Sequence, residues 1–265
     1  MLRTVTFFNE KGGSGKTTFA AIFSSFLAYK LREKVIGVLD FDSPSYHLDG
    51  FRGIDRFYNN ESNRVFHKMC SDAGAPYPVE AIKSDGTFTE EQLSMMARQI
   101  RKRKESEDGY LILDFPGSLR PGDPVFRFAK EGLLDLMVIP ITADSQTRVS
   151  ALRVYSMMHS SLFKSISGKD EGQATLFFWN EVTLTEERAR QSKYDNYERK
   201  LTKELNIKVC NTRVRQIPVL RRDPDNPLVF VRSTMCYPEA NIRRYCPYIE
   251  DLFMEIKNEL DAQSA

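Results

Sequence analysis

A glycine-rich loop near the N-terminus constrains the fold of this chain more than any other feature. It reads NEKGGSGKTT over residues 9–18 and connects a β-rich apolar run at residues 2–9 to an apolar-periodic run at residues 17–30. Gly12, Gly13 and Gly15 allow a tight turn that brings backbone N–H groups close to an anion, and the N-terminus of the following helix adds to the attraction. The sequence therefore predicts a strand, a polyphosphate-binding loop and a helix, in that order.

The polar residues of the loop have the chemistry that a magnesium–nucleoside triphosphate requires. Lys16 can reach the β- and γ-phosphates, and the Thr17 hydroxyl can ligate Mg²⁺. Thr18 is placed to contact the α-phosphate. We expect a nucleoside triphosphate and Mg²⁺ as cofactors, bound by these residues and by Gly12, Gly13, Ser14 and Gly15.

Apolar runs alternate with helical periodicity along most of the chain. Strand-like runs occupy residues 2–9, 35–40, 110–114, 136–139 and 175–179. Helical patterns occupy residues 17–30, 89–104, 145–163, 186–205 and 249–260. Short continuous apolar runs are typical of strands buried on both faces of a parallel sheet, and alternation of β and α implies crossover connections. We expect one α/β domain over residues 1–265, with a doubly wound, mainly parallel sheet and an irregular insertion at about residues 43–87.

The loop departs from the ordinary phosphate-binding pattern at its start. Glu10 occupies the place of the first glycine, and a second lysine, Lys11, comes directly before the glycines. With this second lysine, KGGSGKTT resembles the deviant Walker A box of the ParA/MinD family of ATPases, and the chain is most similar to the short, Soj-like ParA type. The resemblance implies that Lys11 reaches across a dimer interface to the nucleotide of the partner, where a further cation neutralises charge on the transferred phosphoryl group.

Three aspartates follow strand-like runs, where the ligand crevice of an open α/β sheet is formed. Asp40 and Asp42 end VLDFD, and Asp114 ends YLILD. The resemblance implies that Asp42 orients the attacking water and that Asp40 supports the network around Mg²⁺ and the lysine. It implies that Asp114 is the Walker B aspartate, which holds the magnesium shell through water. The family continues after its D-x-D with Pro-Gln, but here Ser43 and Pro44 follow, so the glutamine is absent. In the family motif D-x-P-P-x-L, Gly117 replaces a proline.

Two segments are candidates for contact with the adenine base. Asn180 closes the fifth strand-like run, at a place where related ATPases contact adenine. Pro218 lies in QIPV, which resembles the loop beside the base. A plain strand-end asparagine explains Asn180 equally well.

Positive charge is concentrated in the C-terminal part of the chain. Residues 188–222 contain eleven basic and three acidic residues, a net charge of +8, whereas the whole chain has only +2. A local basic surface is typical of a polyanion-binding protein, although a solvated helix face is the alternative. ParA-like proteins bind DNA non-specifically through basic residues in their C-terminal part. The resemblance therefore gives as candidate DNA-binding residues Arg188, Arg190, Arg213, Arg215, Arg221, Arg222, Arg243 and Arg244.

Several classes of protein are excluded by composition and spacing. No apolar run is long enough to span a bilayer, the first residues do not have the pattern of a signal peptide, and the acidic polar face of the last helical segment argues against membrane binding of the MinD type. The four cysteines form no CxxC pair, and the three histidines are widely spaced, so neither a zinc site nor a disulfide framework is indicated. We expect a cytoplasmic, nucleoid-associated protein.

The sequence therefore predicts a ParA-type ATPase that dimerises on binding ATP, binds duplex DNA non-specifically and partitions a plasmid or chromosome cargo. Hydrolysis would be slow and stimulated by a ParB-like or adaptor protein. Two alternatives remain open at this stage. One is a ParA-like ATPase that positions a protein complex or assists conjugative transfer, and the other is a metabolic enzyme of the same P-loop superfamily.

Overall fold

The computed structural model describes residues 1–31, 34–42, 81–83, 89–168, 172–183, 194–216 and 248–263. The chain divides into two compact units. The first unit contains Met1–Thr6, Thr17–Pro116 and Pro218–Tyr245, and the second contains Phe7–Lys16, Gly117–Ile217 and Cys246–Ala265. Most of the expected insertion at residues 43–87 lies outside the described residues, and the single domain over residues 1–265 stays a prediction.

The first unit is built on parallel strands in the order β3-β2-β4-β1. Their bounds are β1 Leu2–Phe7, β2 Val35–Asp40, β3 Ala81–Lys83 and β4 Gly109–Asp114. Every residue of β4 is buried, as expected for a strand with two neighbours and a covered surface on both faces. Parallel pairing brings the carboxyl ends of β2 and β4 to one edge, where Asp40 is in register with Asp114.

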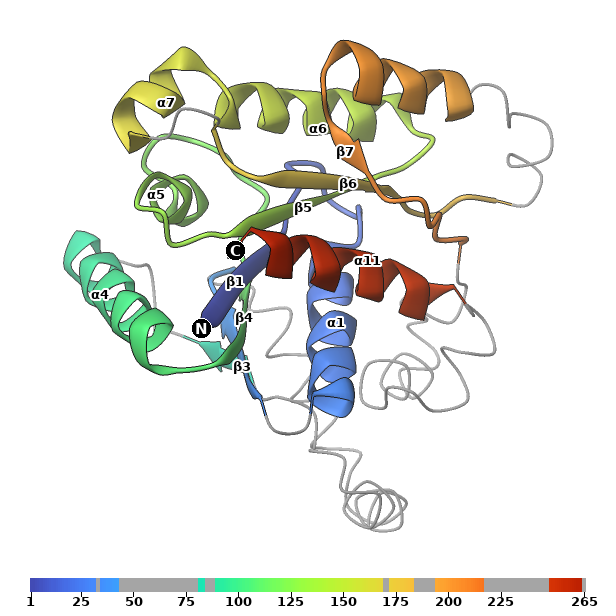
Figure 1. Cartoon of the computed structure of the whole chain (residues 1–265). Helices are drawn as coiled ribbons and strands as arrows, with labels where there is room; N and C mark the ends of the chain where they lie inside the picture. Colours follow the sequence, from blue (N-terminus) through green and yellow to red (C-terminus); the bar gives the residue numbers. More distant parts are fainter. Residues whose placement is uncertain are drawn as a thin grey trace, which may run out of the picture. The chain divides into compact units, whose positions relative to one another are not determined.

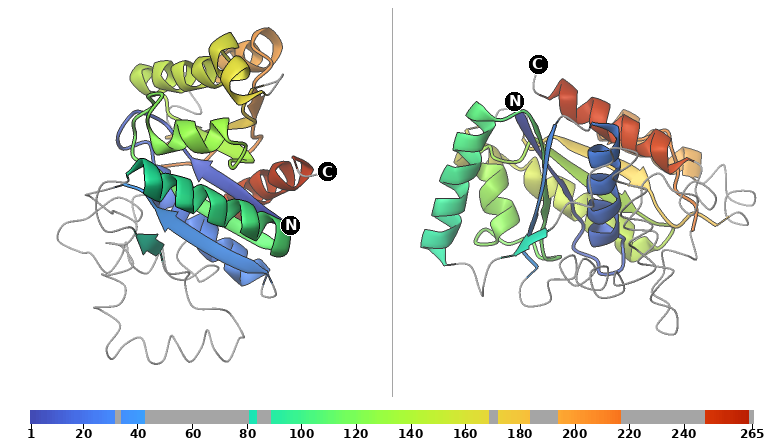
Figure 2. Two further views of the ribbon diagram at one scale, coloured as in Figure 1. Left: turned by 90° about the vertical axis from the view of Figure 1, so that its left-hand side faces the viewer. Right: turned by 90° about the horizontal axis from the view of Figure 1, so that it is seen from below.

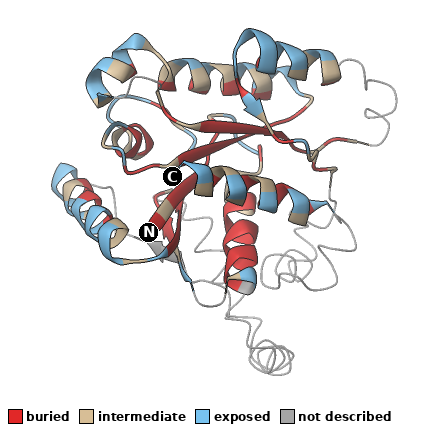
Figure 3. Cartoon of the chain, in the orientation of Figure 1, coloured by how far each residue is buried: buried red, intermediate tan, exposed pale blue. Residues whose placement is uncertain are grey.

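Two helices lie on opposite faces of these strands, as Figures 1 and 2 show. Helix α1 spans Lys16–Lys30 and is buried at every position from residue 19 to residue 28, because its apolar residues surround the whole helix (Figure 3). Helix α4, Glu90–Ser106, is amphipathic and buries Leu93, Ala97 and Ile100, which recur every three or four residues. Helices on both faces make the first unit doubly wound.

The second unit continues with parallel strands β5 Leu136–Ile141, β6 Thr175–Trp179 and β7 Lys208–Val209. Its described helices include α5 Pro124–Lys130, α6 Ser145–Met158, α7 Ser161–Ser167, η2 Lys200–Glu204 and α11 Ile249–Ala262. Helices α6 and α11 both contact β5 and lie on opposite faces of the strands (Figures 1 and 2). β5 and β6 are buried throughout.

The prediction of an α/β fold with a doubly wound parallel arrangement is confirmed, but one helix prediction is wrong in extent. The helix expected over residues 145–163 ends at Met158, and a second helix, α7, begins at Ser161. Ser160 terminates the run because its side chain accepts a hydrogen bond from Phe163 N, at 3.1 Å, and caps α7. Among the helices in the described part of the chain, none combines the length and apolarity needed to cross a bilayer.

Candidate functional site

The backbone of the glycine-rich loop has the conformation that its sequence predicts. Gly13 and Gly15 have φ angles of +76° and +96°, in the left-handed region that glycine adopts without strain. Helix α1 begins directly afterwards at Lys16, so the loop leads into a helix N-terminus whose first N–H groups have no partner within the helix. This is the local geometry of an anion-binding loop.

The two lysines of the loop lie in different environments. The Lys16 ammonium donates to the carbonyl oxygen of Lys11 at 3.4 Å, so this side chain folds over the loop itself. Lys11 is exposed, and its Nζ donates to Gln146 Oε1 on α6 at 2.8 Å. The Lys16 ammonium therefore lies against the loop, whereas the Lys11 ammonium lies at the surface of the second unit.

Asn9, to which the sequence analysis gave no role, anchors the start of the loop. Its side chain is fully buried. Nδ2 donates to the carbonyl oxygens of Pro140 and Thr147 at 2.9 and 3.3 Å, and Oδ1 accepts from Lys11 N and Ser150 Oγ at 3.0 and 2.6 Å. Apart from Lys11, these partners belong to the end of β5 and the first turns of α6. Only its position at the end of the first strand-like run could have drawn attention to Asn9.

The candidate adenine residue Asn180 also holds the loop. It is 6% exposed, and its Nδ2 donates to the carbonyl oxygen of Ser14 at 2.9 Å. Its backbone N–H donates to the carbonyl oxygen of Ile141 at 2.7 Å, which fixes the residue at the ends of β5 and β6. An adenine contact by Asn180 stays a prediction, and the other candidate, Pro218, lies outside the described residues.

Gly117, which replaces a proline of the family motif, lies close to the loop. A Cβ atom at this position would be 3.0 Å from the carbonyl oxygen of Glu10 and 3.2 Å from Lys16 Nζ. Both contacts are tighter than ordinary van der Waals distances, so a larger residue would require the loop to shift. The glycine therefore permits a close approach between the segment after β4 and the loop.

In the first unit, two of the three predicted aspartates lie side by side. Asp40 and Asp114 end neighbouring strands in register and are each 1% exposed. Asp42 donates its backbone N–H to Asp40 Oδ1 at 3.0 Å, and Phe41 N donates to the carbonyl oxygen of Asp114 at 2.8 Å. Two buried carboxyl groups at one strand edge offer oxygen ligands of the kind that a divalent cation prefers.

The donor set of the first unit fits a magnesium ion, which prefers oxygen ligands and retains several waters. Thr17 and Thr18 are half-buried in the first turn of α1 and add hydroxyl groups to the two carboxylates. Within the described ranges there is no group of three or more histidine, cysteine, aspartate or glutamate residues that could hold a metal by themselves. Any metal here would need further oxygen atoms from phosphate and water.

The structure describes only two of the eight candidate DNA-binding residues, Arg213 and Arg215. Arg213 is 13% exposed and forms ion pairs with Asp195 and Glu198, at 2.8 and 2.9 Å, so its charge is neutralised within the second unit. Arg215 is half-buried and lies over the ring of Tyr248. Arg188, Arg190, Arg221, Arg222, Arg243 and Arg244 lie outside the described residues.

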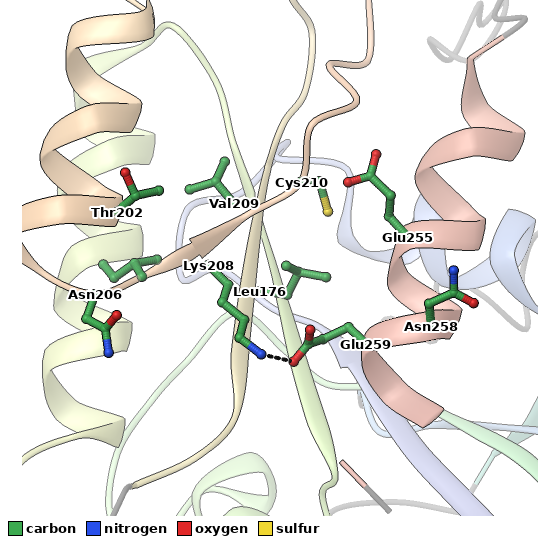
Figure 4. Close-up of a pocket in the computed structure, with 10 residues that line it drawn as sticks. Leu176, Thr202, Asn206, Lys208, Val209, Cys210, Glu255, Asn258 and Glu259 are labelled. Atoms are coloured by element: carbon green, nitrogen blue, oxygen red, sulfur yellow. Dashed lines mark hydrogen bonds and ion pairs between the residues drawn. The ribbon is translucent and has the colours of Figure 1, made fainter. Parts of the chain in front are cut away.

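The surface of the second unit has two hollows of interest. A groove of about 430 Å³ runs beside the loop and is lined by Lys11, Gln146, Val149, Arg153 and their neighbours. A larger one of about 600 Å³ lies between β7, η2 and α11, and none of the predicted site residues lines it (Figure 4). Cys210 lines this second hollow, and burial raises the pKa of its thiol far above the ordinary value, so it stays protonated.

Three solved structures share the fold of this chain at low sequence identity. A ParA family ATPase from Chlorobium tepidum is 17% identical, with a TM-score of 0.56 over 95% of this chain and 97% of that chain. A chain of the MinC:MinD cell division protein complex from Aquifex aeolicus is 16% identical, with a TM-score of 0.61 over 97% and 96%. The pNOB8 ParA bound to nonspecific DNA is 20% identical, with a TM-score of 0.50 over 100% and 99%.

These similarities show the α/β P-loop NTPase fold, and a sequence-family model adds the family. No curated protein sequence matches the chain. The model of the ATPase MipZ family matches residues 3–150, more than half of the chain, and the matched segment includes the glycine-rich loop and all three candidate aspartates. The chain therefore belongs to the MipZ family, among the P-loop ATPases of the ParA/MinD type.

Proposed function

We propose that this protein is an ATP-dependent, dimerising switch that binds DNA non-specifically and positions a plasmid or chromosome cargo. The observation that carries the proposal is the loop over residues 9–18, in which two left-handed glycines precede the N-terminus of α1 and a second, exposed lysine precedes the glycines. The first feature suits a nucleotide, and the second suits a site that a partner subunit completes.

Nucleotide binding would use the loop backbone of Gly12, Gly13, Ser14 and Gly15, with Lys16 neutralising the β- and γ-phosphates. Thr17, Asp40 and Asp114 would hold magnesium, directly or through water, and the ion would screen the phosphate charge when bound. The buried register pair of Asp40 and Asp114 supports this assignment.

Dimerisation and hydrolysis would depend on Lys11 and Asp42. Lys11 of one protomer would approach the nucleotide of the other, which its exposure permits. Asp42 would orient the attacking water at the edge where β2 ends, in a position fixed by the hydrogen bond to Asp40. Turnover would be slow, as suits a switch rather than a metabolic catalyst. An adaptor protein would then accelerate hydrolysis and release the dimer.

DNA binding is supported by the net charge of +8 over residues 188–222. Contacts between arginine and phosphate would give binding that is independent of sequence and weakens steeply with salt. Of the two candidate arginines that the structure describes, Arg213 is less suited than Arg215, because it is already paired with two carboxylates. One structural neighbour is a ParA bound to nonspecific DNA. Such binding would place the protein on the nucleoid.

The test combines nucleotide binding, dimerisation and DNA binding. The wild-type protein with ATP and Mg²⁺ should dimerise and bind a duplex of arbitrary sequence, and with ADP it should do neither. Lys16→Ala should lose nucleotide binding, whereas Lys11→Ala should retain it and lose dimerisation. Dimerisation without DNA binding would favour the alternative switch that positions a protein complex. Nucleotide binding with no dimer in any state would overturn the proposal in favour of a metabolic enzyme.

A further inference from the structure

Three consecutive residues at the start of the nucleotide loop form hydrogen bonds or ion pairs with one face of α6. Asn9 contacts Thr147 and Ser150, Glu10 pairs with Arg153 at 3.5 Å, and Lys11 donates to Gln146. Residues 146, 150 and 153 follow one another at helical spacing, so they share one side of the helix. The helix itself begins with a cap in which Asp144 accepts from Thr147 N at 3.1 Å.

Asn9 is the centre of this arrangement because all of its hydrogen-bonding capacity is used. The two hydrogen bonds that its Nδ2 donates end on β5 and α6, and its Oδ1 accepts one bond from Lys11 N in the loop and one from Ser150 Oγ. A fully buried amide with all of its bonds satisfied has one favourable orientation, since any other leaves a polar group unpaired. The backbone N–H of Lys11 donates to Asn9 Oδ1, and the backbone carbonyl oxygen of Lys11 accepts a hydrogen bond from the Lys16 ammonium.

We infer that Asn9 and Ser150 are positioning residues for the nucleotide site. Together they hold the backbone N–H of Lys11 against α6 and so fix the shape of the phosphate-binding loop. Neither residue contacts the nucleotide in this assignment. The inference rests on the proposed nucleotide binding and adds the residues that hold the loop ready for it. Pre-organisation of this kind lowers the cost of ordering the loop when the ligand binds.

Ser150→Ala is the decisive variant, because it removes one donor from Asn9 and leaves the loop sequence intact. We expect it to weaken binding of a fluorescent ATP analogue and of ADP alike, by about two- to tenfold, the range that corresponds to one hydrogen bond. Asn9→Ala should weaken both nucleotides further. Ser150→Thr, which keeps the hydroxyl, should restore binding. Ser156→Ala is the matched control, on an exposed position of the same helix.

Thermal unfolding distinguishes positioning from general stability. The Ser150 variants should unfold near the wild-type temperature while their nucleotide affinities differ. Wild-type affinity in Ser150→Ala, or an equal loss in Ser156→Ala, would overturn the inference. Absence of nucleotide binding by the wild-type protein would instead overturn the proposed function, so the two failures are distinguishable.

Discussion

At the scale of single residues, neighbouring glycines of the loop have different structural requirements. Gly13 has a φ of +76°, where a side chain is disfavoured by its own backbone. Gly12 has no such φ, and a Cβ atom there would meet nothing within 4 Å. The backbone conformation therefore requires glycine at position 13, whereas at position 12 neither the conformation nor the surrounding space does.

This difference predicts opposite effects on stability. Gly13→Ala should lower the free energy of unfolding by about 1 kcal/mol, because alanine must adopt a left-handed conformation. Gly12→Ala should leave it unchanged or raise it slightly, since alanine restricts the unfolded chain more than glycine does. Chemical denaturation of both variants without nucleotide checks the prediction. Equal destabilisation of the two would show that the left-handed φ at Gly13 is not what requires glycine.

At the scale of helices and strands, polar side chains terminate elements and join one element to another. Glu255 of α11 accepts hydrogen bonds from the backbone N–H groups of Asn211 and Thr212, at 2.7 and 2.9 Å, directly after the short strand β7. Glu259, one turn later, pairs with Lys208 at 2.7 Å (Figure 4). These contacts hold α11 against β7 and against the segment that follows it.

Helix α4 begins with a capping box whose energetic value can be measured. Thr89 accepts a hydrogen bond from Gln92 N at 3.2 Å, and Gln92 Oε1 accepts from Thr89 N at 2.8 Å. Thr89→Ala should lower the free energy of unfolding by about 1 kcal/mol, the usual cost of losing such a cap. Thr89→Ser keeps the accepting oxygen and should remain near wild type. A serine variant as unstable as the alanine variant would mean that the cap contributes little.

The elements that could be predicted from the sequence are those that depend on neighbouring residues in the chain. The runs at residues 35–40 and 110–114 became β2 and β4 because continuous apolar sequence with a terminal aspartate fixes both the strand and its end. β3 and β7, at three and two residues, are too short to leave a pattern. The loop was predictable from its glycines and lysines, whereas the role of Asn9 depends on Pro140, Thr147 and Ser150, more than 130 residues away in the chain.

At the scale of the whole molecule, one carboxylate of the first unit links the starts of three strands. Asp108, half exposed, comes immediately before β4. Its side chain pairs with Lys34, which precedes β2, and with Arg3 of β1 at 3.8 Å. Its carbonyl oxygen also accepts from Val35 N at 3.1 Å. The starts of three parallel strands are thus held by ion pairs to a single aspartate.

This cluster predicts a specific dependence of stability on pH. Hydrogen bonds from the Lys34 side chain and from the N-terminal ammonium lower the pKa of Asp108 from 3.8 to about 2. Since the folded pKa lies below the unfolded one, the carboxylate stabilises the fold above about pH 4 and loses this effect as the pH falls towards 2. Wild type should therefore be more stable than Asp108→Asn at neutral pH, and the difference should shrink between about pH 4 and pH 2. Denaturant unfolding of both proteins across this range measures that difference, and a gap that stays constant with pH would mean that Asp108 supports the strands without its charge.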